Sequence, residues 1–332
     1  MANIDRFKQL ISNSKTIVIT THVSPDADGI GSQIALSIAL KSLNKNVFCI
    51  NQEELLPRYQ YLDKDKIVVG FDRKKLKIKT IDLFIIVDAN SVNRIGPDLK
   101  ELSQNANELL FIDHHPAPRE FLALHYIDVS KAATGEIVAE LIQTLGVQFT
   151  YQMALALYTS IIIDTNSFQY PTVGSKTHST VSKLLKTGIS PPQAMKEIYG
   201  QENISFYHFL GKVLSKTKCS SDNRIVYVTI TLKDLEDYQI DPEDTHGIIN
   251  QILTYRPALV LCMFRELTKN STKISFRSMG AINVGSMAEA LGGGGHSYSA
   301  ATIIKFPLRK SVDHVLKIVS LILDSDNQIK GS

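Results

Sequence analysis

The sequence has few cysteines. Only three occur among its 332 residues, Cys49, Cys219 and Cys262, and they lie far apart without the spacing of a metal site. Each lies in or beside an apolar stretch that resembles a strand. We therefore expect these thiols to contribute to packing in a reducing compartment.

Long hydrophobic runs are also missing. The most apolar stretches, such as residues 83–87 and 258–264, are far shorter than the roughly 20 residues that span a bilayer. Residues 4–11 carry apolar side chains at helical spacing, which predicts an amphipathic helix and not a signal peptide. These features predict a cytoplasmic protein with no membrane partner.

The sequence also lacks a large net charge. With 36 Lys and Arg against 33 Asp and Glu, the formal net charge is +3. This small charge does not indicate non-specific binding of long nucleic acids. Binding of a small anionic ligand at a local site is still compatible with this charge. Hydrophobic residues make up 44%, enough for substantial cores, so we expect a globular protein.

Short β-branched stretches alternate with helical patterns in the first part of the chain. The predicted strands are residues 16–20, 46–50, 83–87, 109–112 and 125–129, and the predicted helices are residues 30–43, 134–145, 152–163 and 179–186. Nearly continuous apolar strands separated by helices are typical of a parallel sheet covered on both faces. We therefore predict an α/β domain over residues 1–190, built on a doubly wound parallel sheet.

A smaller domain is predicted after residue 220. Residues 191–220 are expected to form a helical linker, because Pro191 and Pro192 mark a helix start and a second helical pattern follows. Beyond it lie predicted strands at 225–232, 259–267, 273–277 and 300–306 and predicted helices at 284–291 and 311–323. This order predicts an α+β domain with a mixed sheet over residues 221–332.

Acidic and histidine side chains follow several of the predicted strands and one helix. They are His22, Asp26, Asp28, Asp88, Asp113, His114, His115 and Asp164. The carboxyl ends of parallel strands meet at one edge of a sheet, where ligands bind. Carboxylates this crowded would repel one another unless cations neutralise them.

Oxygen and imidazole ligands without a thiolate suit Mn²⁺, while Fe²⁺, Co²⁺, Zn²⁺ and Mg²⁺ are less favoured. Six or seven ligands exceed the needs of one ion, so two ions are the simplest solution. A two-metal site holds the attacking and leaving oxygens of a phosphoryl displacement, which predicts phosphoester hydrolysis.

Each of these residues also has an ordinary interpretation when it is taken alone. Asp26 or Asp28 could cap the helix that follows, and Asp164 could cap a turn. Asp88 is a common type of strand-end residue, and a single His114 or His115 is usually a satisfied histidine. Their coincidence at successive segment ends favours the metal site.

A glycine-rich stretch, LGGGGHSYSA, runs from Leu291 to Ala300. Its consecutive glycines, including Gly293, Gly294 and Gly295, could present N–H groups to an anion, and His296 could touch a phosphate. No Lys followed by Ser or Thr comes after them, so a P-loop is not supported. A flexible linker or a tight connection is the alternative.

Upstream of this stretch, FRSMGAINV places Arg277 and Ser278 at a strand end and Asn283 after a turn. Arginine is suited to bidentate phosphate contacts and to stacking on a base. A single arginine such as Arg277 is nevertheless more often a solvated surface charge.

The ordered set HVSPDADGIGS, DANSVNRIG, DHH, DTNSF, FRSMGAINV and GGGGH resembles the DHH phosphoesterase family with its DHH-associated C-terminal domain. The resemblance covers about residues 16–306, and the subgroup it resembles is the nanoRNase/pAp phosphatase type. It implies that His22, Asp26 and Asp88 hold one Mn²⁺ ion. It implies a second Mn²⁺ held by Asp28, Asp88, His114 and Asp164, with Asp88 bridging the two ions.

The resemblance also implies roles for residues that do not bind the ions. His115 would face the scissile phosphate, and Asp113 would orient the site. The second domain would hold the substrate in an interdomain cleft through Arg277, Ser278, Asn283, Gly293, Gly294, Gly295 and His296.

The expected activity is a Mn²⁺-dependent phosphodiesterase and phosphatase. It would hydrolyse short oligoribonucleotides (nanoRNA) to 5′-mononucleotides and dephosphorylate 3′-phosphoadenosine 5′-phosphate (pAp). Hydrolysis of cyclic di-AMP or of linear pApA is the alternative, and a non-catalytic nucleotide sensor is the alternative from another class. Family members often dimerise, which leaves a homodimer open.

Overall fold

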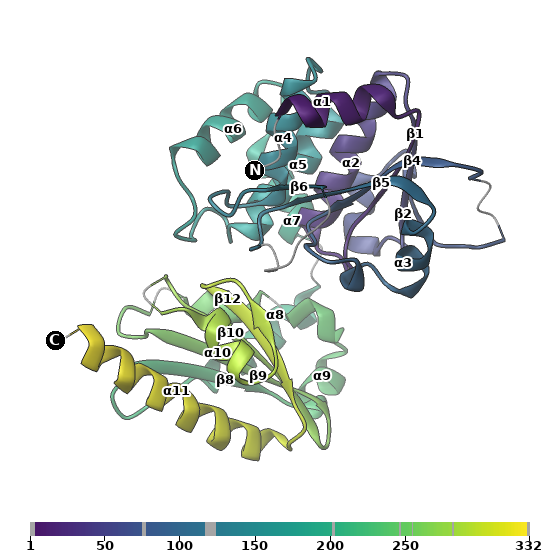
Figure 1. The fold of residues 1–332 in the computed structure, drawn as a ribbon. Helices are drawn as coiled ribbons and strands as arrows, with labels where there is room; N and C mark the ends of the chain where they lie inside the picture. The colour runs from purple at the N-terminus through teal and green to yellow at the C-terminus, as the bar shows by residue number, and fades with distance from the viewer. Residues whose placement is uncertain are drawn as a thin grey trace. The chain divides into compact units, whose positions relative to one another are not determined.

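The chain divides into two compact units, residues 1–201 and residues 202–332. Figure 1 shows the ribbon of a computed structural model. The structure describes residues 4–74, 78–116, 124–200, 203–245, 247–253, 255–280 and 282–330.

The first unit is built on a parallel sheet. Its strands are β1 (Thr16–Thr20), β2 (Asn46–Asn51), β3 (Val68–Gly70), β4 (Ile81–Val87), β5 (Ala106–Asp113) and β6 (Leu124–Ile127). Their order in the sheet is β3-β2-β1-β4-β5-β6, and every neighbouring pair is parallel. The predicted doubly wound parallel sheet is therefore confirmed.

Helices cover both faces of this sheet (Figure 1). They are α1 (Ile4–Asn13), α2 (Ala27–Ser42), α3 (Pro97–Ser103), α4 (Thr134–Thr144), α5 (Tyr151–Asp164), α6 (Ser175–Leu185) and α7 (Pro191–Tyr199), with short 3-10 turns η1 (Pro57–Leu62) and η2 (Val92–Arg94). Ile17 and Ile19 pack in the core beneath α2, whereas Val18 points into the core on the side of α3. Because both faces are buried, the strands are apolar throughout.

Helix α2 is buried along most of its length and packs against α5. A Cβ atom at Gly31 would lie 2.3 Å from the carbonyl oxygen of Ala156, so the two backbones approach closely only because residue 31 has no side chain. This close crossing brings the start of α2 and the middle of α5 together. Both carry residues of the predicted metal centre or residues that contact it.

The second unit has a mixed sheet. Its strands are β7 (Lys218–Cys219), β8 (Ile225–Ile230), β9 (Val260–Thr268), β10 (Ser271–Arg277), β11 (Gly294–Gly295) and β12 (Ser299–Ile304), and its helices are α8 (Ile204–Ser215), α9 (Leu232–Tyr238), η3 (Pro242–Thr245), η4 (Ile248–Ile252), α10 (Val284–Ala290) and α11 (Leu308–Lys330). The order is β11-β12-β10-β9-β8-β7, in which β8 and β9 are parallel and the other pairs antiparallel. Helices α10 and α11 pack on its core. The predicted α+β domain with a mixed sheet is confirmed.

Several boundaries differ from the prediction. The strand predicted at 225–232 ends at Ile230, because Thr231 begins α9 with a capping box in which its side chain accepts from the Asp234 N–H. The short strands β3, β7 and β11 were not predicted, since two or three residues carry no readable alternation. Among the described residues, no helix is long and apolar enough to cross a membrane.

Candidate metal centre

The loop between β1 and α2 carries His22, Asp26 and Asp28. Asp26 is the N-cap of α2, and its Oδ1 accepts hydrogen bonds from the N–H groups of Asp28 (2.9 Å) and Gly29 (3.3 Å). The capping interpretation therefore describes a real contact. Because a carboxylate has a second oxygen, capping does not prevent Asp26 from binding a cation as well.

The first candidate ligand group consists of His22, Asp26 and Asp88. Each offers one ligand atom, and these atoms lie within 4.8 Å of one another. The Nε2 atom of His22 lies 3.5 Å from Oδ2 of Asp88. On the other side of the ring, Nδ1 lies 2.8 Å from the carbonyl oxygen of Val23 and must donate to it, which leaves Nε2 facing the carboxylates.

Asp88 follows the last residue of β4 and lies between the two ligand groups. Its backbone is left-handed, with φ of 57°, and its N–H donates to the carbonyl of Ile112 in the neighbouring strand β5 (2.9 Å). While its Oδ2 faces His22, its Oδ1 lies 4.0 Å from Nε2 of His114. The strained turn at the strand end thus aims one carboxylate at both groups.

The second group consists of Asp28, His114 and Asp164, again with ligand atoms within 4.8 Å of one another. Nε2 of His114 lies 3.1 Å from Oδ2 of Asp164 and 3.7 Å from Oδ2 of Asp28. Nδ1 of His114 lies 3.3 Å from the carbonyl oxygen of Lys131, so this ring is also oriented by a backbone acceptor. Metal-binding histidines are commonly oriented in this way.

Asp164 is the last residue of α5, and an unusual turn follows it. Asn166, Ser167 and Phe168 all have left-handed backbones, with φ of 47°, 56° and 67°. The buried hydroxyl of Thr165 accepts from the Phe168 N–H (3.0 Å) and donates to the Ile161 carbonyl (2.6 Å), which stabilises the turn. Such strain is typical of functional sites and here fixes the helix end that carries Asp164.

His115 and Asp113 form a pair beside these groups. Oδ1 of Asp113 accepts from the backbone N–H of His115 (3.1 Å) and contacts its Nδ1 (2.7 Å). Asp113 is fully buried, whereas the His115 side chain is 18% exposed. The carboxylate therefore orients a ring that solvent and a substrate can reach.

The charges of the two ligand groups suit the binding of divalent cations. Burial alone would lower the pKa of His22, but the hydrogen bond with Asp88 and the charges of Asp26 and Asp88 raise that pKa to about 9. Burial raises the pKa of Asp28 well above its usual range, and the charges of Asp88 and Asp164 add to this rise. The Nε2 atoms of His22 and His114 both face carboxylate oxygens. Without a metal ion, a proton neutralises each of these contacts, and a bound cation would take the place of the proton.

Three residues around Asp28 were missed by the sequence analysis. Oδ2 of Asp28 accepts from the Thr134 N–H (2.8 Å), and Oδ1 accepts from the Gly135 N–H (3.0 Å) and from the Ser160 hydroxyl. The sequence feature that could have pointed to these contacts is the Thr-Gly pair at the start of the helix predicted from residue 134. Nothing in that pattern indicated which distant carboxylate it would contact.

The predicted substrate residues of the second unit lie around the loop between β11 and β12. Arg277 pairs with Ser299 across β10 and β12, and the backbone N–H of His296 donates to the Ser299 carbonyl (2.7 Å). Asn283 caps α10, accepting from the Ser286 N–H (3.1 Å). The guanidinium of Arg277 donates through Nε to Oδ1 of Asn250 (3.2 Å), so it is not simply a solvated charge.

The glycine run is not a linker in the structure. Gly294 and Gly295 form β11, and Gly293 packs so tightly that a Cβ there would lie 2.1 Å from the carbonyl oxygen of Ala301. Ser278 is the remaining predicted substrate residue. It is fully buried and its hydroxyl donates to the Ile282 carbonyl (2.6 Å), so it holds the loop, and its predicted contact with substrate stays a prediction.

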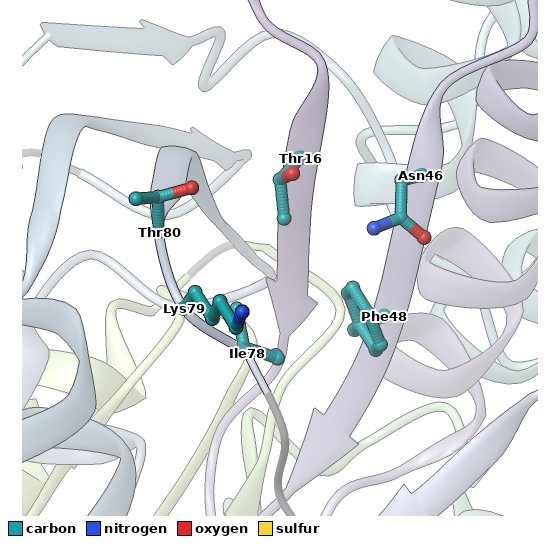
Figure 2. A pocket seen from close by; sticks show the side chains of 6 residues that line it. All are labelled: Thr16, Asn46, Phe48, Ile78, Lys79 and Thr80. Carbon is teal, nitrogen blue, oxygen red and sulfur yellow. The ribbon is translucent and has the colours of Figure 1, made fainter.

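A small pocket of about 220 Å³ lies at the opposite edge of the first sheet (Figure 2). Its lining residues are Thr16, Asn46, Phe48, Ile78, Lys79 and Thr80. Thr16 and Asn46 begin β1 and β2, so this pocket lies at the amino ends of the strands. The metal ligands follow the carboxyl ends, and we do not assign the pocket to their chemistry.

Adding Mn²⁺ to the metal-free chain is expected to raise its melting temperature. At a concentration 100 times its Kd, each ion stabilises the folded state by about 2.7 kcal/mol, and each kcal/mol shifts the melting temperature of a unit of this size by about 2–4 °C. Two ions would therefore give a shift of roughly 10–20 °C. Calorimetric scans with Mn²⁺ and with a chelator measure it, and identical scans would contradict the site.

The same shift is expected to grow between pH 6.5 and pH 9. Because the folded pKa of His22 is raised from 6.5 to about 9, its protonation stabilises the metal-free chain at low pH, and this contribution is lost as the pH rises through 9. A bound cation needs the unprotonated ring, so its affinity increases over the same range. Scans at a series of pH values test this, and a shift that shrinks with pH would contradict it.

Comparison with known proteins places the two units of the chain in known domain families. Residues 16–161 match the model of the DHH family, N-terminal domain, and residues 222–324 match the DHHA1 domain. The bifunctional oligoribonuclease and PAP phosphatase NrnA of Thermus thermophilus is 29% identical over 91% of this chain and 89% of its own length. The cyclic-di-AMP phosphodiesterase GdpP of Bacillus subtilis is 27% identical, covering 89% of this chain but 46% of its own.

Among solved structures, an exopolyphosphatase-related protein from Bacteroides fragilis has a similar fold. Its TM-score is 0.86 at 25% identity, with 99% of this chain and 97% of that chain covered. The fold, the two domain matches and the ordered ligand groups agree with one another. The chain therefore belongs to the DHH phosphoesterases with a DHHA1 domain, a family of metal-dependent enzymes.

Proposed function

We propose that this enzyme hydrolyses short oligoribonucleotides to 5′-mononucleotides and dephosphorylates pAp, using two Mn²⁺ ions. The observation that carries the proposal is the pair of ligand groups on either side of Asp88. The similarity to NrnA over nearly the full length of both chains supports the substrate class. Oxygen and imidazole ligands without thiolate support Mn²⁺.

In this proposal His22, Asp26 and Asp88 hold one ion, and Asp28, Asp88, His114 and Asp164 hold the other. The bound ions would supply Lewis-acid stabilisation of the phosphoryl oxygens and a more acidic water. Asp88 keeps the two positions adjacent, because its two oxygens face His22 and His114 respectively.

His115 acts on the substrate in this proposal. The Nδ1–H group of His115 donates a hydrogen bond to Asp113. The other ring nitrogen, Nε2, can then donate a proton to the leaving oxygen. The pair therefore protonates the leaving group as the phosphoester bond breaks.

The DHHA1 domain would bind the rest of the nucleotide. Arg277, Asn283 and His296 lie around one loop. Beside it, the backbones of Gly293 and Gly295 pack closely against β12, and Gly294 pairs with Ala301 of that strand. A guanidinium oriented by Asn250 suits a terminal phosphate. We assign residues 1–190 to catalysis, 221–332 to substrate binding and 191–220 to the connection between them.

Hydrolysis of cyclic di-AMP or pApA is the second candidate, and the similarity to GdpP favours it. A side-by-side assay with Mn²⁺ separates the candidates. The substrates are a 5′-phosphorylated RNA dimer of mixed sequence, a longer RNA, pAp, cyclic di-AMP and pApA. We expect the dimer and pAp to be turned over fastest.

Faster turnover of cyclic di-AMP or pApA than of the mixed dimer and pAp would favour the second candidate. A third outcome concerns a non-catalytic nucleotide sensor. Tight calorimetric binding of a nucleotide that is recovered intact after long incubation with Mn²⁺ would favour that role and contradict the proposal.

A further inference from the structure

We propose that Thr134 is a positioning residue that links the two metal positions. This inference rests on the proposed two-metal site. Thr134 is the first residue of α4 and is fully buried. Through two different atoms it contacts the carboxylate of Asp28 and the carboxylate of Asp88, which the two ligand groups share.

The first contact is made by the backbone. The N-cap of α4, Ala133, makes no side-chain capping hydrogen bond. The helix start is capped instead by Asp28, which accepts the N–H groups of Thr134 (2.8 Å) and Gly135 (3.0 Å). A helix N-terminus stabilises a carboxylate anion, which opposes the effect of burial on Asp28.

The second contact is made by the side chain. The hydroxyl of Thr134 donates to Oδ1 of Asp88 (3.1 Å). Asp88 lies between the two groups, with Oδ2 facing His22 and Oδ1, which accepts from Thr134, facing His114, whereas Asp28 belongs to the group with His114 and Asp164. One rigid residue therefore fixes the distance between the shared carboxylate of Asp88 and the carboxylate of Asp28.

This link matters because of the spacing that the chemistry needs. Two ions that share a phosphoryl group lie roughly 3.5–4 Å apart. The direction of the Asp88 carboxylate would set that spacing, and the Thr134 hydroxyl fixes Oδ1 while Oδ2 faces His22. A free carboxylate would rotate and lose this geometry.

The next residue, Gly135, has no room for a side chain. A Cβ at Gly135 would lie 2.0 Å from the Ser160 hydroxyl oxygen, which itself donates to Asp28. Glycine at 135 is thus needed for Ser160 to reach Asp28. The Thr134 hydroxyl is the part of this arrangement that can be removed without changing the backbone or the volume of the side chain.

Mn²⁺ titration calorimetry on the full chain tests the proposal. Thr134→Val keeps the backbone N–H and the shape of the side chain but removes the donor to Asp88. Removing a group that orients metal ligands typically costs about 10–100-fold in metal affinity, and we expect a loss of that size. Thr134→Ser, which keeps the hydroxyl, should restore affinity close to that of the unsubstituted chain.

Thr272→Val is the matched control. Thr272 is also fully buried and its hydroxyl donates one hydrogen bond, to the Phe306 carbonyl at 3.0 Å in the second unit. This variant should bind Mn²⁺ like the unsubstituted chain. Circular dichroism of each metal-free variant verifies that it is folded.

The outcomes separate this inference from the proposed function. If the unsubstituted chain binds no Mn²⁺, the two-metal site itself is wrong. If it binds Mn²⁺ and folded Thr134→Val binds it equally well, the site stands and the role of Thr134 is wrong. Reduced affinity in both Thr134→Val and Thr134→Ser would also overturn it, because the hydroxyl would not be the cause.

Discussion

Replacing Asp88 by asparagine is expected to abolish phosphoester hydrolysis while leaving the fold intact. The amide keeps the size of the side chain and tolerates the left-handed backbone at this position. It removes the negative charge that both ion positions share. Loss of one electrostatic contact at an active site typically costs about 10²–10³-fold in rate, so loss of a shared ligand should reach at least about 10³-fold.

Release of mononucleotides from the RNA dimer and Mn²⁺ calorimetry measure this effect. Asp82→Asn is the control, because Asp82 lies at the other end of the same strand and accepts the Lys15 and Thr16 N–H groups. It should keep full activity. Asp88→Ala should also be inactive, and it should be less stable than Asp88→Asn by about 1 kcal/mol because alanine disfavours the left-handed backbone. Full activity of Asp88→Asn would contradict the bridging role.

Replacing His115 by glutamine is expected to lower kcat by about 10²–10⁴-fold, the usual contribution of proton transfer by a side chain. Mn²⁺ affinity should stay unchanged, because in our account this ring acts on the leaving group and not on the ions. The prediction therefore separates the two adjacent histidines of the DHH motif. His114→Gln, in contrast, should lose metal binding.

Steady-state kinetics and Mn²⁺ titration of the same samples test this separation. His208→Gln is the control, since His208 is an exposed histidine on α8, and its kcat should not change. Asp113→Asn should resemble His115→Gln, and the double variant should be little worse than either single variant. A parallel fall of Mn²⁺ affinity and rate in His115→Gln would instead make His115 a metal ligand.

The sequence alone predicted the parts of the site that follow from topology. Parallel strands end at one edge, so the residues after 16–20, 83–87 and 109–112 had to gather there. Asp26 shows a limit of that reasoning. Capping and metal binding were weighed as alternatives, yet its Oδ1 caps α2 while the side chain also lies within the first ligand group.

The contacts behind the ligands could not be predicted. Thr134 and Ser160 are far from Asp28 in sequence and meet it only because α2 crosses α5 closely at Gly31 and α4 begins beside them. Such approaches depend on packing distances, which periodicity does not report. The burial of Ser278 could not be predicted for the same reason, because a strand-end position does not show that a hydroxyl is fully buried.

The short edge strands illustrate a different limit. Gly294 and Gly295 pair as β11 with β12, although glycine disfavours strands. The pairing forms because Gly293 allows the backbone to approach Ala301, a feature of the tertiary structure. Local propensity was therefore a poor guide to the region that we assign to substrate binding.

The central claim is a pair of ions held on either side of Asp88, and the stoichiometry of bound Mn²⁺ tests it most directly. Metal analysis of the full chain after equilibration with Mn²⁺ and removal of free ions should find two ions per chain, and none in Asp88→Asn. One ion per chain, or two ions retained by folded Asp88→Asn, would contradict the account.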